Sequence, residues 1–189
     1  SYGDCHTPLS LMAEFAPQNR FESFLAVARS EVYWIKNGGT ERLPPLAHAI
    51  WVGNLKNAES IVRFISDEQL RINLAFVDGL NPFAYLFEQD YDCKDFLRTV
   101  AEHRPHALQY AMYYIGRICG RIESLSETQK GFLCNLRQFG MDFNQIMDQC
   151  DCKKTMLTFF MLLPSRSVHD VHFLVSRCGA IPKMYPGIQ

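Results

Sequence analysis

The sequence predicts an all-α protein, a solenoid of stacked helix-turn-helix units. Pro8, Pro45 and Pro82 lie 37 residues apart, and the same interval taken twice leads from Pro82 to Met156. A fixed interval of this length is typical of stacked supersecondary units. An apolar residue follows each of the four positions: Leu9, Leu46, Phe83 and Leu157. A pair of short helices cannot bury such a face alone, so neighbouring units must pack on one another.

Composition and charge exclude several protein classes. The 189 residues are 48% hydrophobic and 21% charged, which is ordinary for a globular chain and far from disorder. The formal net charge of −1 gives no argument for binding nucleic acid or a membrane surface. No run reaches the length of about 18 apolar residues that spans a bilayer. The chain starts at Ser1 and not at Met, so we expect a piece of a longer protein.

The cysteines favour a reducing compartment. There are seven, an odd number without the regular spacing of a disulfide framework, so at least one thiol has no partner within the chain. Cys119, Cys134 and Cys178 lie inside apolar patterns, as small buried hydrophobic residues do. We therefore expect a cytoplasmic or nuclear protein.

The first half of the chain predicts two pairs of helices. The first pair covers residues 9–15 and 21–30, and a polar link at residues 36–42 follows it. In the second pair, one helix follows Pro45 and passes through Trp51, and the other covers residues 58–65. Gly53-Asn54 separates these two helices, since glycine adopts turn conformations without steric cost.

Residues 78–87 predict a turn followed directly by a helix. Asp78-Gly79 supplies the turn, and Asn81 is a helix-capping residue whose side chain can accept from an early backbone N–H. Pro82 then occupies the first helical position, where its missing donor is harmless. Phe83, Leu86 and Phe87 follow at helical spacing as an apolar face.

The second half of the chain is less regular. We expect a short third unit and a long fourth unit, in which residues 116–126 lengthen the loop between two helices. Later helices are expected to end at residues 136–139, before Gly140, and at residues 173–175, before Gly179-Ala180. Between them, residues 156–163 form the longest apolar run.

These units resemble ankyrin repeats. The resemblance rests on Thr7-Pro8-Leu9, on Pro45-Leu46 with Ala49, Gly53 and Asn54, and on Asp78-Gly79 with residues 81–83. The endings before Gly140 and Gly179-Ala180 resemble those of the second helix of such repeats. The resemblance covers the whole chain as one domain of about five degenerate units with short β-hairpin fingers. The expected units are residues 1–37, 38–74, 75–104, 105–147 and 148–189.

An ankyrin-like stack implies a binding scaffold, an adaptor or regulatory module for a protein partner. Its surface is the concave side built from first-helix positions and fingers. When the units are aligned in this way, the residues expected to bind a partner are Glu14, His48, Trp51, Tyr85, Glu88, Tyr110 and Tyr113, with Phe15 and Tyr114 beside them. Trp and Tyr suit such a surface because they bury a large area with little loss of side-chain entropy. The alternative interpretation is that several of these aromatic residues belong to the core between units.

Two other binding functions stay open. Arg117, Arg121, Lys130 and Arg137 form a basic neighbourhood beside Tyr113 and Tyr114, which could bind single-stranded nucleic acid. Glu123, Glu127 and the net charge argue against that partner. The apolar terminal unit, residues 156–175, could instead form a homodimer, because terminal repeats normally need a polar outer face.

The sequence predicts no catalytic site, cofactor or metal. Cys150 and Cys152 lie in an expected finger without a second ligand pair nearby in sequence, which zinc sites normally have. His169 and His172 share one helix face, and we expect it to be solvated, with Val168, Val171, Leu174 and Val175 on the buried face. We find none of the short glycine, serine or histidine motifs of common enzymes. We therefore expect a protein that is not an enzyme.

Overall fold

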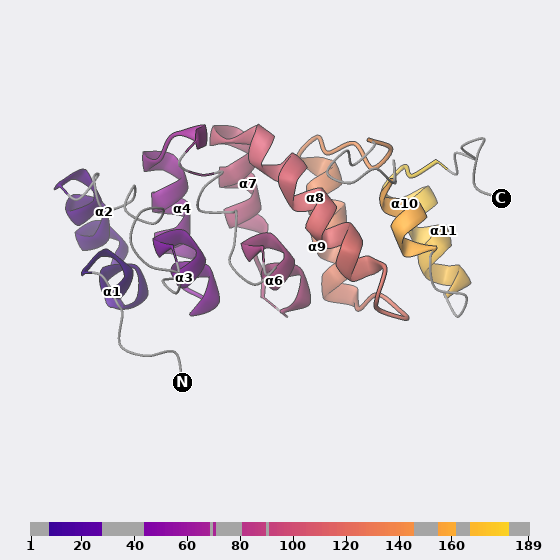
Figure 1. Cartoon of the computed structure of the whole chain (residues 1–189), viewed down its shortest axis with the longest axis horizontal. Coiled ribbons are helices and arrows are strands. Elements are labelled where there is room, and N and C mark those ends of the chain that lie inside the picture. The colour runs from indigo at the N-terminus through magenta and orange to yellow at the C-terminus, as the bar shows by residue number, and fades with distance from the viewer. Residues whose placement is uncertain are drawn as a thin grey trace. The chain divides into compact units, whose positions relative to one another are not determined.

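The structure is a computed structural model that describes residues 8–27, 44–68, 70, 81–89, 91–145, 155–161 and 167–181. Every regular element in these ranges is a helix, so the predicted all-α class is confirmed. Figure 1 shows the helices in chain order, which are α1 (Pro8–Phe15), α2 (Gln18–Val27), α3 (Pro45–Trp51), α4 (Leu55–Phe64), α6 (Pro82–Glu88), α7 (Lys94–His103), α8 (Pro105–Cys119), α9 (Glu127–Gln138), α10 (Met156–Phe160) and α11 (Val168–Ser176).

The regularly spaced residues begin helices, as predicted. Pro8, Pro45 and Pro82 are the first residues of α1, α3 and α6, and Met156 is the first residue of α10. Proline suits this position because a first-turn N–H has no partner inside the helix and the fixed φ angle matches the helix. The 37-residue interval therefore marks positions at which helices begin.

Side chains cap several of these helices. The Oδ1 atom of Asn81 accepts from the N–H of Phe83 at 2.9 Å, so the predicted cap of α6 is confirmed. Asn54 caps α4 in the same way, and this helix begins three residues before its predicted start. Ser126 and Gln129 form a reciprocal capping box at α9. The predicted turn at Asp78-Gly79 lies outside the described residues.

The chain divides into two compact units, residues 1–108 and 109–189. In unit 1, first helices pack on first helices, since α1 contacts α3 and α3 contacts α6. Second helices do the same, from α2 to α4 to α7 (Figure 1). Leu9, Leu46 and Phe83, the residues that follow the three prolines, are fully buried in this stack. Burying one such side chain stabilises the fold by roughly 1.5–3 kcal/mol.

Polar side chains join α1 and α2 to α4. Asn57 is fully buried on α4, and its amide Nδ2 donates to the carbonyl oxygens of Ala13 at 3.0 Å and Ala16 at 2.9 Å. Ala13 lies in the last turn of α1 and Ala16 directly follows the helix, so no helical N–H follows to satisfy these carbonyls. On α2, Glu22 accepts from the hydroxyl of Ser60 at 2.7 Å. The apolar stack is therefore held in one register by directed bonds.

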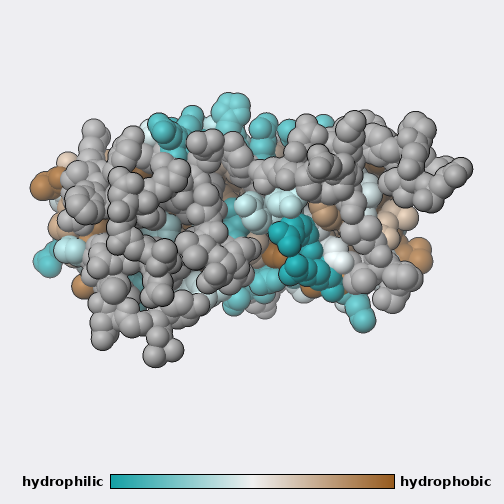
Figure 2. All heavy atoms as spheres, viewed as in Figure 1, coloured by the Kyte–Doolittle hydropathy of each residue, from teal (hydrophilic) through white to brown (hydrophobic). Residues whose placement is uncertain are grey.

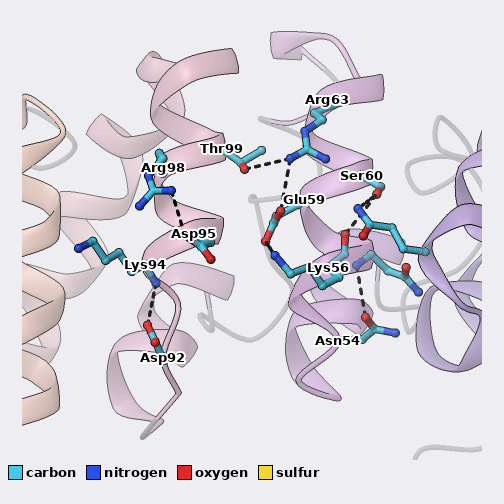
Figure 3. A network of polar contacts seen from close by, with 12 residues as sticks. Asn54, Lys56, Glu59, Ser60, Arg63, Asp92, Lys94, Asp95, Arg98 and Thr99 are labelled. Carbon is cyan, nitrogen blue, oxygen red and sulfur yellow. Dashed lines mark hydrogen bonds and ion pairs between the residues drawn. The ribbon is translucent and has the colours of Figure 1, made fainter.

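A buried carboxylate lies between α4 and α7. Glu59 is 4% exposed and lies between Lys56 at 3.1 Å and Arg63 at 3.3 Å, both on its own helix (Figure 3). The guanidinium of Arg63 also donates to the hydroxyl of Thr99 on α7 at 3.4 Å. A buried charge needs such pairing, because removing it from water is otherwise expensive.

Unit 2 contains most of α8 together with α9, α10 and α11. Asp170 of α11 is 2% exposed, and its Oδ2 atom accepts from the backbone N–H of Leu125 at 2.9 Å. Its other oxygen lies 3.3 Å from the ammonium of Lys130 on α9, which is also 2.9 Å from Glu127. The hydrogen bond to Glu127, followed by that to Asp170, raises the pKa of Lys130. These contacts fix the start of α11 against the start of α9.

Two expectations about unit 2 are wrong. The predicted loop at residues 116–126 begins later, because α8 continues through a buried Gly116 to Cys119. The apolar face of α8 continues through this region, because Ala111, Ile115 and Cys119 are fully buried at intervals of about one turn.

The second error concerns the buried face of α11. Val168 and Val175 are 79% and 38% exposed, whereas Asp170 and Leu174 are buried. The apolar periodicity of this helix does not predict its buried side, which is the side on which Asp170 bonds to Leu125 and Lys130.

We predict that Asn57→Ala destabilises unit 1 by about 1–3 kcal/mol. The substitution removes the amide that donates to the carbonyl oxygens of Ala13 and Ala16. These buried oxygens would then have lost their hydrogen bonds with water without gaining a replacement, which destabilises the folded state. Urea unfolding followed by circular dichroism measures the change. Asn19→Ala, on the exposed surface of α2, is the matched control, and we expect it to change stability by less than about 0.5 kcal/mol. Equal losses in the two variants would contradict this role of Asn57.

Candidate functional site

Trp51 and Tyr85, both predicted to bind a partner, stack on one another. Trp51 ends α3 and Tyr85 lies on α6, so the packing of these two first helices brings them together. Their ring centroids are 5.0 Å apart and their planes differ by 7°. The hydroxyl of Tyr85 also donates to the backbone carbonyl of Trp51 at 3.3 Å. Trp51 nevertheless stays 39% exposed.

A third aromatic residue, Tyr91, joins them. Its ring lies 3.5 Å from the position that a Cβ atom on Gly53 would take. Gly53 has φ of +78°, a conformation that residues with a side chain rarely adopt, so glycine is needed in this turn. Tyr91 lies near enough to Tyr85 to raise the pKa of its phenol, and it is 37% exposed. We call Trp51, Tyr85 and Tyr91 the aromatic cluster.

No pattern in the sequence indicated Tyr91 as a binding residue. It follows the end of α6 and precedes α7, so it belongs to no helical pattern from which a face could be read. Only its closeness to Tyr85 in sequence and the turn residues Gly53-Asn54 could have suggested it. Its place in the cluster depends on contacts between two hairpins.

The phenol of Tyr85 holds its proton more tightly than usual. Burial raises its pKa, and the neighbouring Tyr91 raises it further through charge repulsion and a hydrogen bond. Both causes favour the neutral phenol, because an ionised oxygen would lose solvation and face a second ionisable phenol. The cluster therefore presents uncharged aromatic surface at neutral pH.

His48 and Glu14 were expected on the exposed surface, and this is wrong for His48. It is 6% exposed, and its Nε2 atom lies 2.8 Å from a carboxylate oxygen of Glu14. The backbone carbonyl of Glu14 accepts from Asn54 at 3.1 Å. The pair joins α1 to α3, because both side chains point into the junction between two first helices.

The other predicted contact residues lie apart from the aromatic cluster or outside what is described. Glu88 is exposed at the end of α6, and Phe15 is 73% exposed at the end of α1. Tyr113 and Tyr114 belong to unit 2 and are partly buried, with ring centroids 5.2 Å apart. Tyr113 also contacts Phe159 edge to face. Tyr110 lies on α8, but its side chain is not among the described parts.

The basic neighbourhood of unit 2 is largely engaged within the chain. Arg117 lies over the ring of Tyr113 at 6.0 Å, and Lys130 pairs with two carboxylates. Arg137 donates to the carbonyl of Met141 at 3.3 Å. Arg117, Arg121 and Arg137 are all exposed, and Arg121 follows the end of α8. Three of the four cations therefore have a partner within the chain, although most of them also face solvent.

The predicted metal candidates divide into two groups. Cys150 and Cys152 lie outside the described residues. His169 and His172 are exposed on α11, as expected for a solvated face. Among the residues that are described, no three or more His, Cys, Asp or Glu side chains gather as metal ligands would.

Burial raises the pKa of the Cys93 thiol to about 12, with Asp92 adding to the effect.

No protein-family model, curated protein or solved structure matches this chain. Within the described ranges, none of the helices combines the length and the apolar character needed to cross a membrane. The function must therefore be argued from the surface itself.

We predict that Tyr85 titrates above the ordinary tyrosine pKa of about 10. The folded state binds its proton more tightly than the unfolded state, so Tyr85 contributes stability below about pH 10 that is lost as pH rises through its raised pKa. The difference in ultraviolet absorbance between the wild type and Tyr85→Phe isolates this titration. Tyr91→Phe should move it back toward the ordinary value. An unshifted titration in the wild type would contradict the coupling.

Proposed function

We propose that this chain is a protein-binding module, an ankyrin-like stack of helical hairpins that captures its partner with the aromatic cluster. The observation that carries the proposal is the stacked pair of Trp51 and Tyr85, which remains accessible although it joins two helices. An exposed tryptophan at such a junction is expensive to leave in water, so it favours a site that a partner covers.

The stacking of unit 1 supports the ankyrin-like arrangement. Its first helices contact each other in order, as do its second helices, and they start at the repeat interval of the sequence. In such a stack the first helices form one side, to which Trp51 and Tyr85 both belong. The fingers expected at Asp78-Gly79 and at Cys150 and Cys152 lie outside the described ranges, and between α7 and α8, where the fourth unit was expected to begin, a single residue, Arg104, leaves no room for a finger.

The aromatic cluster is rigid before a partner arrives. The ring of Tyr85 is held by its stack and by a bond to the backbone of Trp51, and Tyr91 lies against the turn at Gly53. Less side-chain entropy is then lost on binding, which leaves more of the contact energy as affinity. Val52, 37% exposed, adds apolar area, and Glu88 can supply a polar rim.

The test compares partner capture between matched variants. Trp51→Ala and Tyr91→Ala should weaken capture at least about tenfold, because buried aromatic anchors carry much of the energy of an interface. Trp51→Phe keeps an aromatic ring that can stack on Tyr85, so this variant should retain most of the affinity for the partner. Affinity purification with quantitative mass spectrometry identifies the partner, and titration with the purified partner then gives the affinity.

Val27→Ala is the control, because Val27 is 86% exposed on a second helix away from the cluster. Circular dichroism must show unchanged helicity in every variant. Capture that is equal in Trp51→Ala, Val27→Ala and the wild type would refute the aromatic cluster as the binding site.

A specific observation favours self-association as a second function. Met161 and Val168, beside the α10–α11 hairpin, are 58% and 79% exposed, and Val175 and Ile181 are exposed nearby. Hydrophobic surface is visible over this hairpin in Figure 2. A second copy of the chain could cover it, as the next repeat would in a longer stack. The engaged cations Lys130 and Arg137 give nucleic acid less support.

If the chain forms a dimer through this face, Val168→Glu should weaken it at least about tenfold, because the new charge would be buried at the interface. Sedimentation velocity over a range of concentrations measures the change. Leu11→Glu, at a 42% exposed position on α1, is the control and should leave dimerisation unchanged. A monomer at all concentrations would exclude this second function without affecting the first.

A further inference from the structure

Two cysteines 44 residues apart in sequence meet in unit 2. Cys134 lies on α9, and Cys178 follows the end of α11. Both are free thiols, and they lie near enough for the Cys134 thiol to raise the pKa of Cys178. A disulfide bond requires two cysteines that are neighbours in the fold, because their Sγ atoms must come within bonding distance.

Contacts that involve neither sulfur hold the two segments together. Arg137, three residues after Cys134 on α9, has a guanidinium nitrogen 3.5 Å from the position of a Cβ on Gly179. Asn144 donates from Nδ2 to the carbonyl of Gly179 at 2.9 Å and accepts from the N–H of Ile181 at 2.6 Å. The backbone next to Cys178 is therefore fixed beside α9, and the proximity of the thiols is a property of the packed unit.

The two thiols differ in accessibility. Cys178 is fully buried, whereas Cys134 is partly exposed. A reagent in solution can thus reach Cys134 first, and Cys178 is positioned to attack whatever forms there. An accessible thiol beside a second, resolving thiol is an arrangement found in redox-sensitive cysteine pairs.

We propose that Cys134 and Cys178 form a modification site, which a low-molecular-weight disulfide such as oxidised glutathione converts into an intrachain disulfide bond. The thiolate of Cys134 attacks one sulfur of glutathione disulfide, the S–S bond of glutathione breaks, and one glutathione leaves and takes up a proton. The thiolate of Cys178 then attacks the Sγ atom of Cys134 and displaces the second glutathione. The two thiol hydrogens of the protein end on two molecules of glutathione.

The environment of Cys178 makes the second step slow at neutral pH. Burial raises the pKa of its thiol to about 12, and Cys134 adds to this, while the guanidinium of Arg137 acts in the opposite direction. Only the thiolate attacks, so ring closure should accelerate about tenfold for each pH unit below that pKa. The site therefore responds to sustained oxidation and leaves the thiols free in a reducing compartment.

The closed bond would tie α9 to the end of α11 and enclose α10 within the loop. If it forms within native packing, it restricts the unfolded chain and raises the thermal unfolding temperature of unit 2 by roughly 10 °C. The bond differs in this respect from oxidation of scattered surface thiols, which closes no such loop.

The experiment incubates the full chain with oxidised glutathione at about pH 7 and pH 9, then quenches it in acid, alkylates it and maps the peptides by mass spectrometry. We expect a crosslink between the peptides of Cys134 and Cys178, formed faster at the higher pH and reversed by a reductant. Repetition in a Cys5→Ser, Cys150→Ser, Cys152→Ser background removes the thiols that lie outside the described residues. Thermal unfolding of the crosslinked and reduced forms is compared in both backgrounds.

Two single variants separate the steps. Cys178→Ala should stop at a stable glutathione adduct on Cys134, and Cys93→Ala, which removes another buried thiol in unit 1, should leave the crosslink unchanged. The proposal is overturned if the wild type retains the adduct at about pH 9 as Cys178→Ala does. It is also overturned if Cys134 pairs with another cysteine, or if the crosslinked form unfolds at a lower temperature. The peptide map of the oxidised wild type tests the crosslink between Cys134 and Cys178 even if a variant fails to fold.

Discussion

The packing of each first helix on the first helix of the next hairpin is the interaction on which unit 1 depends. α3 and α6 have seven residues each, and α1 has eight, which is too short for a helix to be stable alone in water. Their order comes from burial, and Leu9, Leu46 and Phe83 are fully buried within the stack. Each hairpin therefore supplies part of the core of the next.

Apolar packing alone would allow these helices to slide or rotate, and buried polar groups prevent this. Asn57 binds the end of α1, and Glu59 and Arg63 connect α4 to α7. In unit 2, Asp170 has the same effect on α11, even at the expense of exposing Val168. Directed bonds carry a large penalty when broken in a buried site, so they select one arrangement among several that bury similar apolar area.

The aromatic cluster and the thiol pair are both products of contacts between segments distant in sequence. Trp51 and Tyr85 meet because α3 packs on α6, and Cys134 meets Cys178 because α11 ends beside α9. Each lies in a different unit, and each combines rigid surroundings with partial exposure. In the proposed binding function, fixed aromatic rings lower the entropy cost of capturing a partner, and packing of the surrounding segments keeps the two thiols near each other.

The sequence by itself determined the helical class, the helix starts at Pro8, Pro45 and Pro82, and the cap at Asn81. These features are local, because caps, proline and apolar spacing act within one or two turns. It also selected Trp51 and Tyr85, but only the tertiary structure showed that they stack, that Tyr91 joins them and that His48 is buried against Glu14. Periodicity tells which residues share a face of a helix. Which neighbour covers that face depends on long-range packing, and there a single buried bond, such as that of Asp170, outweighs the apolar pattern.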